Sequence, residues 1–184
     1  MKGHHAGDDH DPRLALLRSH VRDVPDFPKP GILFRDLTPL MGDATALAAC
    51  IGLLAERVSG HRPDVVVAVE SRGFIFGAPV ASDLGVGFAP VRKPGKLPAR
   101  KLRRTYELEY GTDSLEMHAD AVRADTRVVI IDDLLATGGT AAATVELVRE
   151  QGAAVVAAAF VVELAVLTGR ARLPGVHVDS LIAY

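Results

Sequence analysis

The sequence predicts an α/β fold with a mostly parallel sheet of about five strands flanked by helices. Short apolar runs recur at Asp64–Glu70, Arg127–Ile131 and Ala153–Glu163, a pattern typical of strands that are buried on both faces of a parallel sheet. Helical patterns lie between these runs. Two of the runs end in polar residues and glycine that open the next helix, which is where open α/β sheets bind ligands.

The N-terminal part differs in composition from the rest. Residues 1–11 are rich in Gly, His and Asp, so we expect a disordered tail, followed by a single domain over 12–184. Leu14, Leu17 and Val21 have helical spacing and predict a short amphipathic helix. The segment Pro25–Pro39 is too rich in proline for a central strand, which predicts a structured surface loop.

The first half of the predicted sheet follows a capped helix. Asp43 is placed to cap a helix whose apolar face reaches Val58, and Cys50 lies on that face as a core residue. After the strand at Asp64–Glu70, glycine at the start of the next helix predicts an anion-binding turn. A third strand is predicted at Phe88–Lys93, where Pro90 indicates an edge strand or a strand start.

A basic segment follows this strand. Seven basic residues and no acidic residue occur in it: Arg92, Lys93, Lys96, Arg100, Lys101, Arg103 and Arg104. Alone, such a run indicates a solvated loop or a nucleic-acid patch, but beside two anion-binding turns it indicates a funnel for a polyanionic substrate. The segment Thr105–His118 then has hairpin character around Gly-Thr-Asp.

The most informative stretch joins the strand Arg127–Ile131 to a helix at Ala141–Gln151. Asp132 and Asp133 are expected to stop the strand, and Ala136–Thr140 forms a loop of small residues. Its glycines allow backbone N–H groups to converge on an anion at the positive end of the helix, which predicts a phosphate cradle. The final strands are predicted at Ala153–Glu163 and Val176–Tyr184.

The paired acids complete the chemistry of this loop. A carboxylate repels phosphate, but Asp132 and Asp133 can accept hydrogen bonds from a ribose diol. Thr137 and Thr140 add hydroxyl donors for the phosphate. The pattern therefore predicts a sugar-phosphate site; the alternative is a turn that merely caps the helix.

Composition excludes several classes of protein. At 184 residues with 48% hydrophobic residues, the chain is long enough to bury one core. Its net charge of −2 gives no global basic field for nucleic acid. No apolar run approaches a membrane span and no signal-peptide pattern follows the N-terminus, so we expect a cytoplasmic protein. A single cysteine excludes an internal disulfide.

The stretch Val129–Thr140 resembles the phosphoribosyl-diphosphate binding motif of type I phosphoribosyltransferases, and DDLLATGGT is similar to the adenine phosphoribosyltransferases among them. The resemblance extends from about Val24 to Tyr184. It implies purine salvage by transfer of the phosphoribosyl group from 5-phospho-α-D-ribose 1-diphosphate to adenine, giving AMP and diphosphate. It also implies small-molecule substrates, Mg²⁺ carried on the diphosphate with no protein metal ligand, and a homodimer.

The resemblance assigns roles by position. It implies that residues of about 12–40 form a hood over the base and that about 94–120 form a flexible catalytic hairpin. Glu109 would handle the base proton, while Asp132 and Asp133 orient the ribose. The remaining implied contacts are Leu33, Phe34, Arg35 and Leu164 for adenine; Glu70, Ser71, Arg72, Arg92, Lys96 and Tyr110 for diphosphate; and Ala136, Thr137, Gly138, Gly139 and Thr140 for the 5′-phosphate.

Three alternatives remain open at this point. A phosphoribosyltransferase for another purine would carry the same phosphate motifs. A regulator that senses phosphoribosyl diphosphate without transfer is opposed by the intact pair Glu109 and Tyr110 and by the lack of an added helix-turn-helix segment. A synthase of this diphosphate is opposed because such chains have two related halves, and this sequence contains no duplication.

Overall fold

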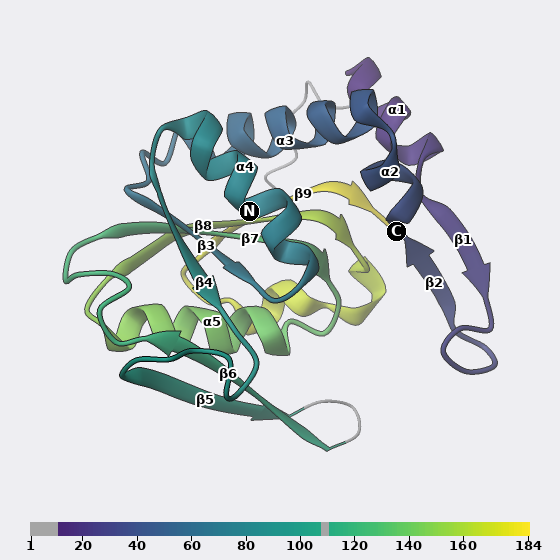
Figure 1. Ribbon diagram of the computed structural model, residues 1–184. Coiled ribbons are helices and arrows are strands. Elements are labelled where there is room, and N and C mark those ends of the chain that lie inside the picture. Colours follow the sequence, from purple (N-terminus) through teal and green to yellow (C-terminus); the bar gives the residue numbers. More distant parts are fainter. Residues whose placement is uncertain (1–10, 108–110) are drawn as a thin grey trace. The chain divides into compact units, whose positions relative to one another are not determined.

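The computed structural model describes residues 11–107 and 111–184 (Figure 1). The chain divides into two compact units, Met1–Gly52 and Leu53–Tyr184. Residues 1–10 of the expected tail at 1–11 and the predicted site residues Glu109 and Tyr110 lie outside the described residues, whereas Asp11 is the ordered N-cap of the first helix. The expectation of a single domain over 12–184 stays a prediction.

The first unit contains short elements built around the proline-rich segment. Asp11 caps its first helix by accepting a hydrogen bond from the backbone N–H of Arg13 at 2.9 Å, and Leu14 and Leu17 are buried. Two short strands pair antiparallel, so the predicted surface loop contains one strand of a small separate sheet. The elements are α1 (Pro12–Ser19), β1 (Arg22–Pro25), β2 (Leu33–Asp36), α2 (Thr38–Gly42) and the start of α3 (Ala44–Ser59).

The second unit is organised around a five-stranded sheet in the order β4-β3-β7-β8-β9, in which every neighbouring pair is parallel. The predicted fold class is confirmed. Strand β4 lies at an edge of the sheet, which is one of the two positions that Pro90 indicated. The strands are β3 (Val65–Val69), β4 (Gly87–Val91), β7 (Arg127–Leu135), β8 (Ala154–Glu163) and β9 (His177–Ala183).

Strand β7 corrects one expectation. Asp132 and Asp133 do not stop it, because β7 continues to Leu135. Its pairing with β8 continues through Asp132 opposite Phe160 and Leu135 opposite Glu163. The neighbouring strand therefore supplies backbone partners beyond the acids, and that pairing outweighs the poor strand propensity of aspartate.

Helices cover both faces of this sheet. Helix α4 (Arg72–Leu84) packs on one face and α5 (Gly139–Glu150) on the other (Figure 1). The approach of α4 is close, because a Cβ atom at Gly77 would lie 2.5 Å from the Cβ of Ala68 on β3. The core between the layers is apolar and includes the fully buried side chains of Phe76, Ile130 and Phe160.

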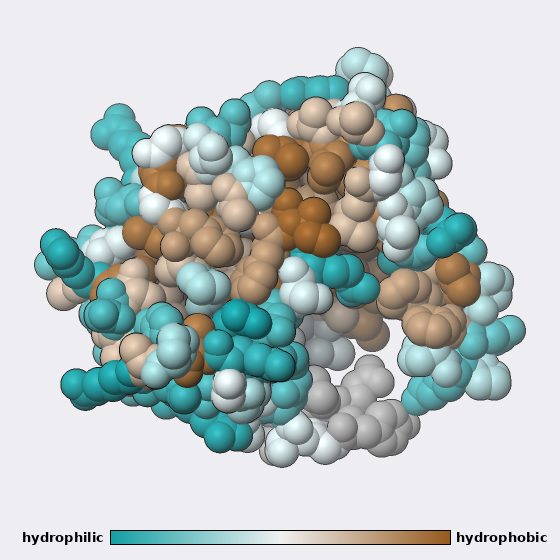
Figure 2. Space-filling view, viewed as in Figure 1, coloured by the Kyte–Doolittle hydropathy of each residue, from teal (hydrophilic) through white to brown (hydrophobic). Residues whose placement is uncertain are grey.

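Two further parts complete the second unit. An antiparallel hairpin of β5 (Lys101–Glu107) and β6 (Thr112–His118) lies against α5, where Arg104 forms ion pairs with Glu146 and Glu150. Figure 2 shows mostly hydrophilic side chains over this hairpin. The short helices η2 (Ala165–Leu167) and η3 (Gly169–Arg172) connect β8 to β9. Over 11–107 and 111–184, none of the helices has both the length and the apolar character that crossing a membrane requires.

Candidate active site

The carboxyl ends of β3 and β7 bring two predicted groups of residues together. Because these strands are parallel neighbours, the turn after β3 lies beside the acids at the end of β7. Arg72 Nε donates a hydrogen bond to Asp133 Oδ2 at 2.5 Å. One residue predicted for diphosphate therefore contacts one predicted for ribose, although 61 positions separate them in the sequence.

The acid pair is almost completely buried. Asp132 and Asp133 are each 8% exposed, and the backbone N–H of Asp133 donates to Asp132 Oδ1 at 2.9 Å. Burial raises the pKa of Asp132 well above its usual value, and the charge of Asp133 raises it further. Such an environment favours a group that gives a hydrogen bond to the Asp132 carboxylate, as a sugar hydroxyl does.

Gly73 allows α4 to begin beside this pair, a role that the sequence reasoning missed. A Cβ atom at Gly73 would lie 2.7 Å from Asp132 Oδ1 and 3.4 Å from the Ile131 carbonyl oxygen. The signal was present in the sequence, since Gly73 directly follows the predicted residues 70–72. The glycine is needed for close approach between a helix start and a buried carboxylate.

The predicted phosphate cradle at Ala136–Thr140, hereafter the phosphate turn, leads into α5. Gly138 takes φ 82°, a left-handed conformation that glycine adopts without strain, and α5 begins at Gly139. The first N–H groups of a helix have no partner within it, so those of α5 are available to an anion. Thr140 Oγ1 donates to the Tyr106 hydroxyl at 3.2 Å, which connects the hairpin to this turn.

The turn after β3 is held by the basic segment. Glu70 Oε2 accepts hydrogen bonds from Arg92 Nε at 3.0 Å and from the Lys93 backbone N–H at 2.8 Å. These bonds lower the pKa of Glu70, and the charge of the exposed Lys96 lowers it further. Arg92 is therefore paired with Glu70, while Ser71, at the turn itself, is exposed.

A second polar chain escaped the sequence reasoning. Lys93 Nζ forms an ion pair with Asp113 on β6, and the Tyr106 hydroxyl donates to the same carboxylate at 3.3 Å. Tyr106 also accepts the bond from Thr140. The hairpin therefore contacts both the segment that holds Glu70 and the phosphate turn, through pairings that no local motif reveals.

The residues predicted for adenine fall in both units. In the first unit, Leu33 is 45% exposed, Phe34 packs edge-to-face on Phe27 with ring centroids 5.1 Å apart, and Arg35 forms an ion pair with Asp23. In the second unit, the Leu164 backbone N–H donates to the Leu135 carbonyl oxygen at 2.9 Å. Leu164 therefore lies at the end of β7, next to the phosphate turn.

The comparisons with known proteins agree with this geometry. The phosphoribosyl transferase domain family matches residues 43–180. The chain is 56% identical over 168 residues to an adenine phosphoribosyltransferase of Rhodospirillum centenum, covering 91% of this chain and 98% of the relative. It is 59% identical over 160 residues to that of Sorangium cellulosum, covering 87% and 80%.

Solved structures give the same result. The crystal structure of adenine phosphoribosyltransferase from Thermoanaerobacter pseudethanolicus superposes with a TM-score of 0.90 at 53% identity, covering 93% of this chain and 99% of that one. The Saccharomyces cerevisiae enzyme gives 0.87 at 41% identity, covering 92% and 98%. The resemblance inferred from DDLLATGGT is thereby confirmed, and the chain belongs to the phosphoribosyl transferase family, among its adenine phosphoribosyltransferases.

Proposed function

We propose that the chain transfers the phosphoribosyl group of 5-phospho-α-D-ribose 1-diphosphate to adenine, releasing diphosphate and forming AMP. In this reaction the bond from the ribosyl carbon to diphosphate oxygen breaks, a bond to a ring nitrogen of adenine forms, and the base gives up one proton. The observation that carries the proposal is the contact of Arg72 with Asp133, which joins the turn proposed to bind diphosphate to the acid pair proposed to bind the ribose diol.

The ribose 5-phosphate half is assigned to β7 and α5. Asp132 and Asp133 accept hydrogen bonds from the ribose hydroxyls and orient the ribosyl carbon. Residues 136–140 hold the 5′-phosphate through backbone N–H groups and threonine hydroxyls at the positive end of α5. Because burial of a free carboxylate is costly, the sugar hydroxyls also relieve the desolvation of Asp132.

The diphosphate half is assigned to the turn after β3 and to the basic segment. Ser71 and Arg72 are exposed at this turn, so both are accessible to a ligand. Lys96 is also exposed, while Arg92 is held by Glu70. Positive charge at this place stabilises the negative charge that develops on the departing diphosphate.

The assignment of base recognition follows the family resemblance. The backbone of Leu33 and Arg35 supplies an N–H and a carbonyl that match an adenine edge, while Phe34 and Leu164 pack on the ring. Glu109 takes the base proton, and closure of the predicted hairpin at about 94–120 excludes water from the ribosyl carbon. The Saccharomyces cerevisiae relative was crystallised with adenine and an imino-altritol bisphosphate, which supports a site that takes a base together with a sugar phosphate.

Mg²⁺ is proposed to arrive on the diphosphate. Over 11–107 and 111–184 there is no group of three or more His, Cys, Asp or Glu that could hold a metal ion. The proposal rests on the family resemblance and on the chemistry of Mg²⁺, which keeps several waters and binds mainly to substrate phosphate oxygens. When bound, the ion would supply charge neutralisation for the leaving diphosphate.

We also propose a cytoplasmic location and a homodimer. The homodimer is supported by the family resemblance and by the apolar side chains of Ile75 and Phe88, which are 41% and 36% exposed in the second unit. Sedimentation of the purified protein distinguishes a dimer from a monomer directly.

Competition between purine bases tests the substrate assignment. Adenine, hypoxanthine and guanine are supplied together with phosphoribosyl diphosphate, and the nucleotides formed are separated by chromatography. We expect AMP as the main product, whereas IMP or GMP as the main product would assign the chain to another purine. Binding of phosphoribosyl diphosphate with no nucleotide formed from any base would instead identify a regulator.

A further inference from the structure

A polar cluster outside the substrate contacts stands close to the phosphate turn. Glu163, the last residue of β8, is 5% exposed, and the guanidinium of Arg170 on η3 donates two hydrogen bonds to its carboxylate. Arg170 Nε donates to Glu163 Oε1 at 2.7 Å and Nη2 donates to Oε2 at 2.6 Å. This fork-to-fork geometry fixes the position of Arg170 more firmly than a single ion pair would.

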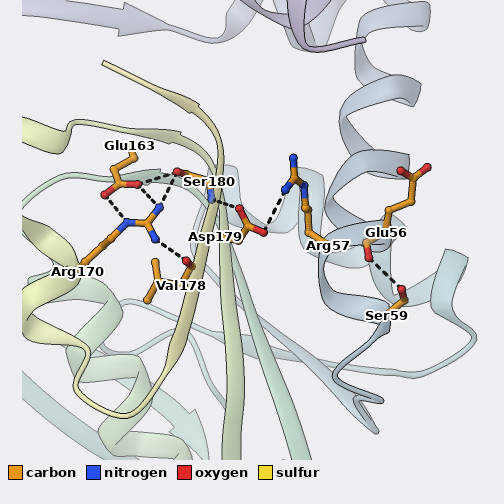
Figure 3. Close-up of polar contacts among 8 residues, drawn as sticks. All are labelled: Glu56, Arg57, Ser59, Glu163, Arg170, Val178, Asp179 and Ser180. Carbon is orange, nitrogen blue, oxygen red and sulfur yellow. Dashed lines mark hydrogen bonds and ion pairs between the residues drawn. The ribbon is translucent and has the colours of Figure 1, made fainter. Parts of the chain in front are cut away.

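The cluster extends to β9 (Figure 3). The Ser180 hydroxyl donates to Glu163 Oε2 at 2.7 Å, and Arg170 Nη2 donates to the Ser180 hydroxyl oxygen at 3.0 Å. Arg170 Nη1 also donates to the Val178 carbonyl oxygen at 2.5 Å. The backbone at the start of η3 is thereby attached to two strands of the sheet.

The residue before Arg170 is packed directly against the phosphate turn. A Cβ atom at Gly169 would lie 2.3 Å from the Ala136 carbonyl oxygen and 3.1 Å from the Gly138 backbone nitrogen. In the opposite direction, a Cβ atom at Gly138 would lie 2.4 Å from the Gly169 carbonyl oxygen. The two backbones touch at two glycines with no space for a side chain on either one.

We propose that Arg170 and Glu163 are positioning residues for the ribose 5-phosphate site. The bidentate ion pair holds Gly169 against Ala136 and Gly138, and this contact keeps the N–H groups of the phosphate turn aimed at the 5′-phosphate. The inference rests on the proposed function, because it assumes that residues 136–140 bind that phosphate. Neither Glu163 nor Arg170 needs to touch the substrate.

The test compares two ligands that report on different halves of the site. Ribose 5-phosphate reports on the phosphate turn, and inorganic diphosphate reports on the turn after β3. For Arg170→Ala, we expect the Kd of ribose 5-phosphate and the KM of phosphoribosyl diphosphate to rise by about 10-fold or more, since small misplacements of a binding group have large effects. The Kd of diphosphate should change less than about 2-fold, because the atoms nearest to Gly169 belong to Leu135, Ala136 and Gly138 at the end of β7 and in the phosphate turn.

A second variant and a matched control keep the test decisive. Gly169→Ala leaves the ion pair in place but forces the backbones apart, so it should cause the same selective loss. Arg57→Ala is the control, because Arg57 pairs with Asp179 at 3.6 Å beside Ser180 on β9 but on the other side of the strand (Figure 3). It should lower Tm without changing the Kd of ribose 5-phosphate.

The outcomes separate this inference from the proposed function. If the wild-type protein binds no ribose 5-phosphate and forms no AMP, the proposed function fails. If the wild-type protein does both and either Arg170→Ala or Gly169→Ala, folded by its cooperative thermal transition, binds ribose 5-phosphate as tightly as wild type, the positioning role is wrong. An equal loss for both ligands also overturns it, since that pattern indicates general unfolding.

Discussion

Arg72 Nε lies 2.5 Å from Asp133 Oδ2 and joins the turn after β3 to the acid pair at the end of β7. The Arg72 side chain is 45% exposed, so the same guanidinium remains accessible to a ligand. Its charge also lowers the pKa of the neighbouring Asp132, against the raising effects of burial and of Asp133. One side chain therefore connects the predicted diphosphate and ribose contacts.

Replacing this arginine should weaken substrate binding and the chemical step together. For Arg72→Ala we expect kcat/KM for phosphoribosyl diphosphate to fall by about 10²-fold, because a charge that stabilises the leaving group is lost. Arg123→Ala is a matched control, since this exposed arginine precedes β7 at its amino-terminal end. Equal kcat/KM values for the two variants would contradict the role given to Arg72.

Asp132→Asn should separate activity from stability. We expect kcat to fall by about 10²-fold or more, because an amide oxygen accepts hydrogen bonds from the ribose hydroxyls less strongly than a carboxylate does. The folded protein should nevertheless become more heat-stable at neutral pH, since the variant no longer buries an ionisable carboxyl beside Asp133. Steady-state kinetics and thermal unfolding of the same preparation test both parts.

The pH dependence of this stability difference follows from the raised pKa of Asp132. The stability that protonated Asp132 contributes is complete below its unfolded value of 3.8 and is lost as pH rises through the raised folded pKa. The Tm of Asp132→Asn minus that of wild type should therefore grow as pH rises above that unfolded value. A difference that shrinks with rising pH would show that the pKa of Asp132 is lowered instead.

Gly73→Ala adds one buried methyl group and should lower the activity of the site. The added Cβ would meet Asp132 Oδ1 at 2.7 Å, so the carboxylate or the start of α4 must move, and we expect kcat/KM to fall by about 10-fold or more. Gly52→Ala is the control, because a Cβ there meets nothing within 4 Å. In the interior of α3 it should stabilise the protein by about 0.5–1 kcal/mol with unchanged kinetics. Equal kinetics for both variants would contradict this account of Gly73.

In the first unit, Asp36 at the end of β2 accepts hydrogen bonds from Thr38 and Arg22, so its contribution to the free energy of unfolding should depend on pH. Hydrogen bonds from Thr38 and from Arg22 lower its pKa from 3.8 to about 2. The stability it contributes is present above its unfolded value of 3.8 and is lost as pH falls through about 2. Asp36→Asn should therefore be less stable than wild type in urea at neutral pH, and the gap should narrow in acid. A gap independent of pH would contradict the assigned cause.

Local patterns in the sequence were sufficient for most of the sheet. The apolar runs predict β3, β7 and β8 because a strand buried on both faces needs continuous apolar residues. Pro90 indicates an edge strand or a strand start because proline cannot donate a hydrogen bond to a neighbouring strand, and β4 lies at the edge. The end of β7 could not be predicted, because it depends on pairing of Leu135 with Glu163 of β8 rather than on the acids themselves.

The candidate site also contains residues that local sequence predicts and contacts that it does not. Residues 132–140 form a continuous segment, so glycine, threonine and paired aspartates are sufficient to predict their chemistry. The bond between Tyr106 and Thr140 and the contact between Gly138 and Gly169 join segments about 30 positions apart, and each needs the folded sheet. The basic residues from Arg92 to Arg104 indicated a role in anion binding without revealing which atoms meet.

The most direct measurement of the central claim is AMP formation by the purified protein from adenine and phosphoribosyl diphosphate, with and without Mg²⁺. Chromatography of the nucleotides and an assay for released diphosphate follow both products. The account predicts AMP and diphosphate in equal amounts in the presence of Mg²⁺, and a rate that falls sharply without it. No AMP from the folded protein with Mg²⁺ present would contradict the account.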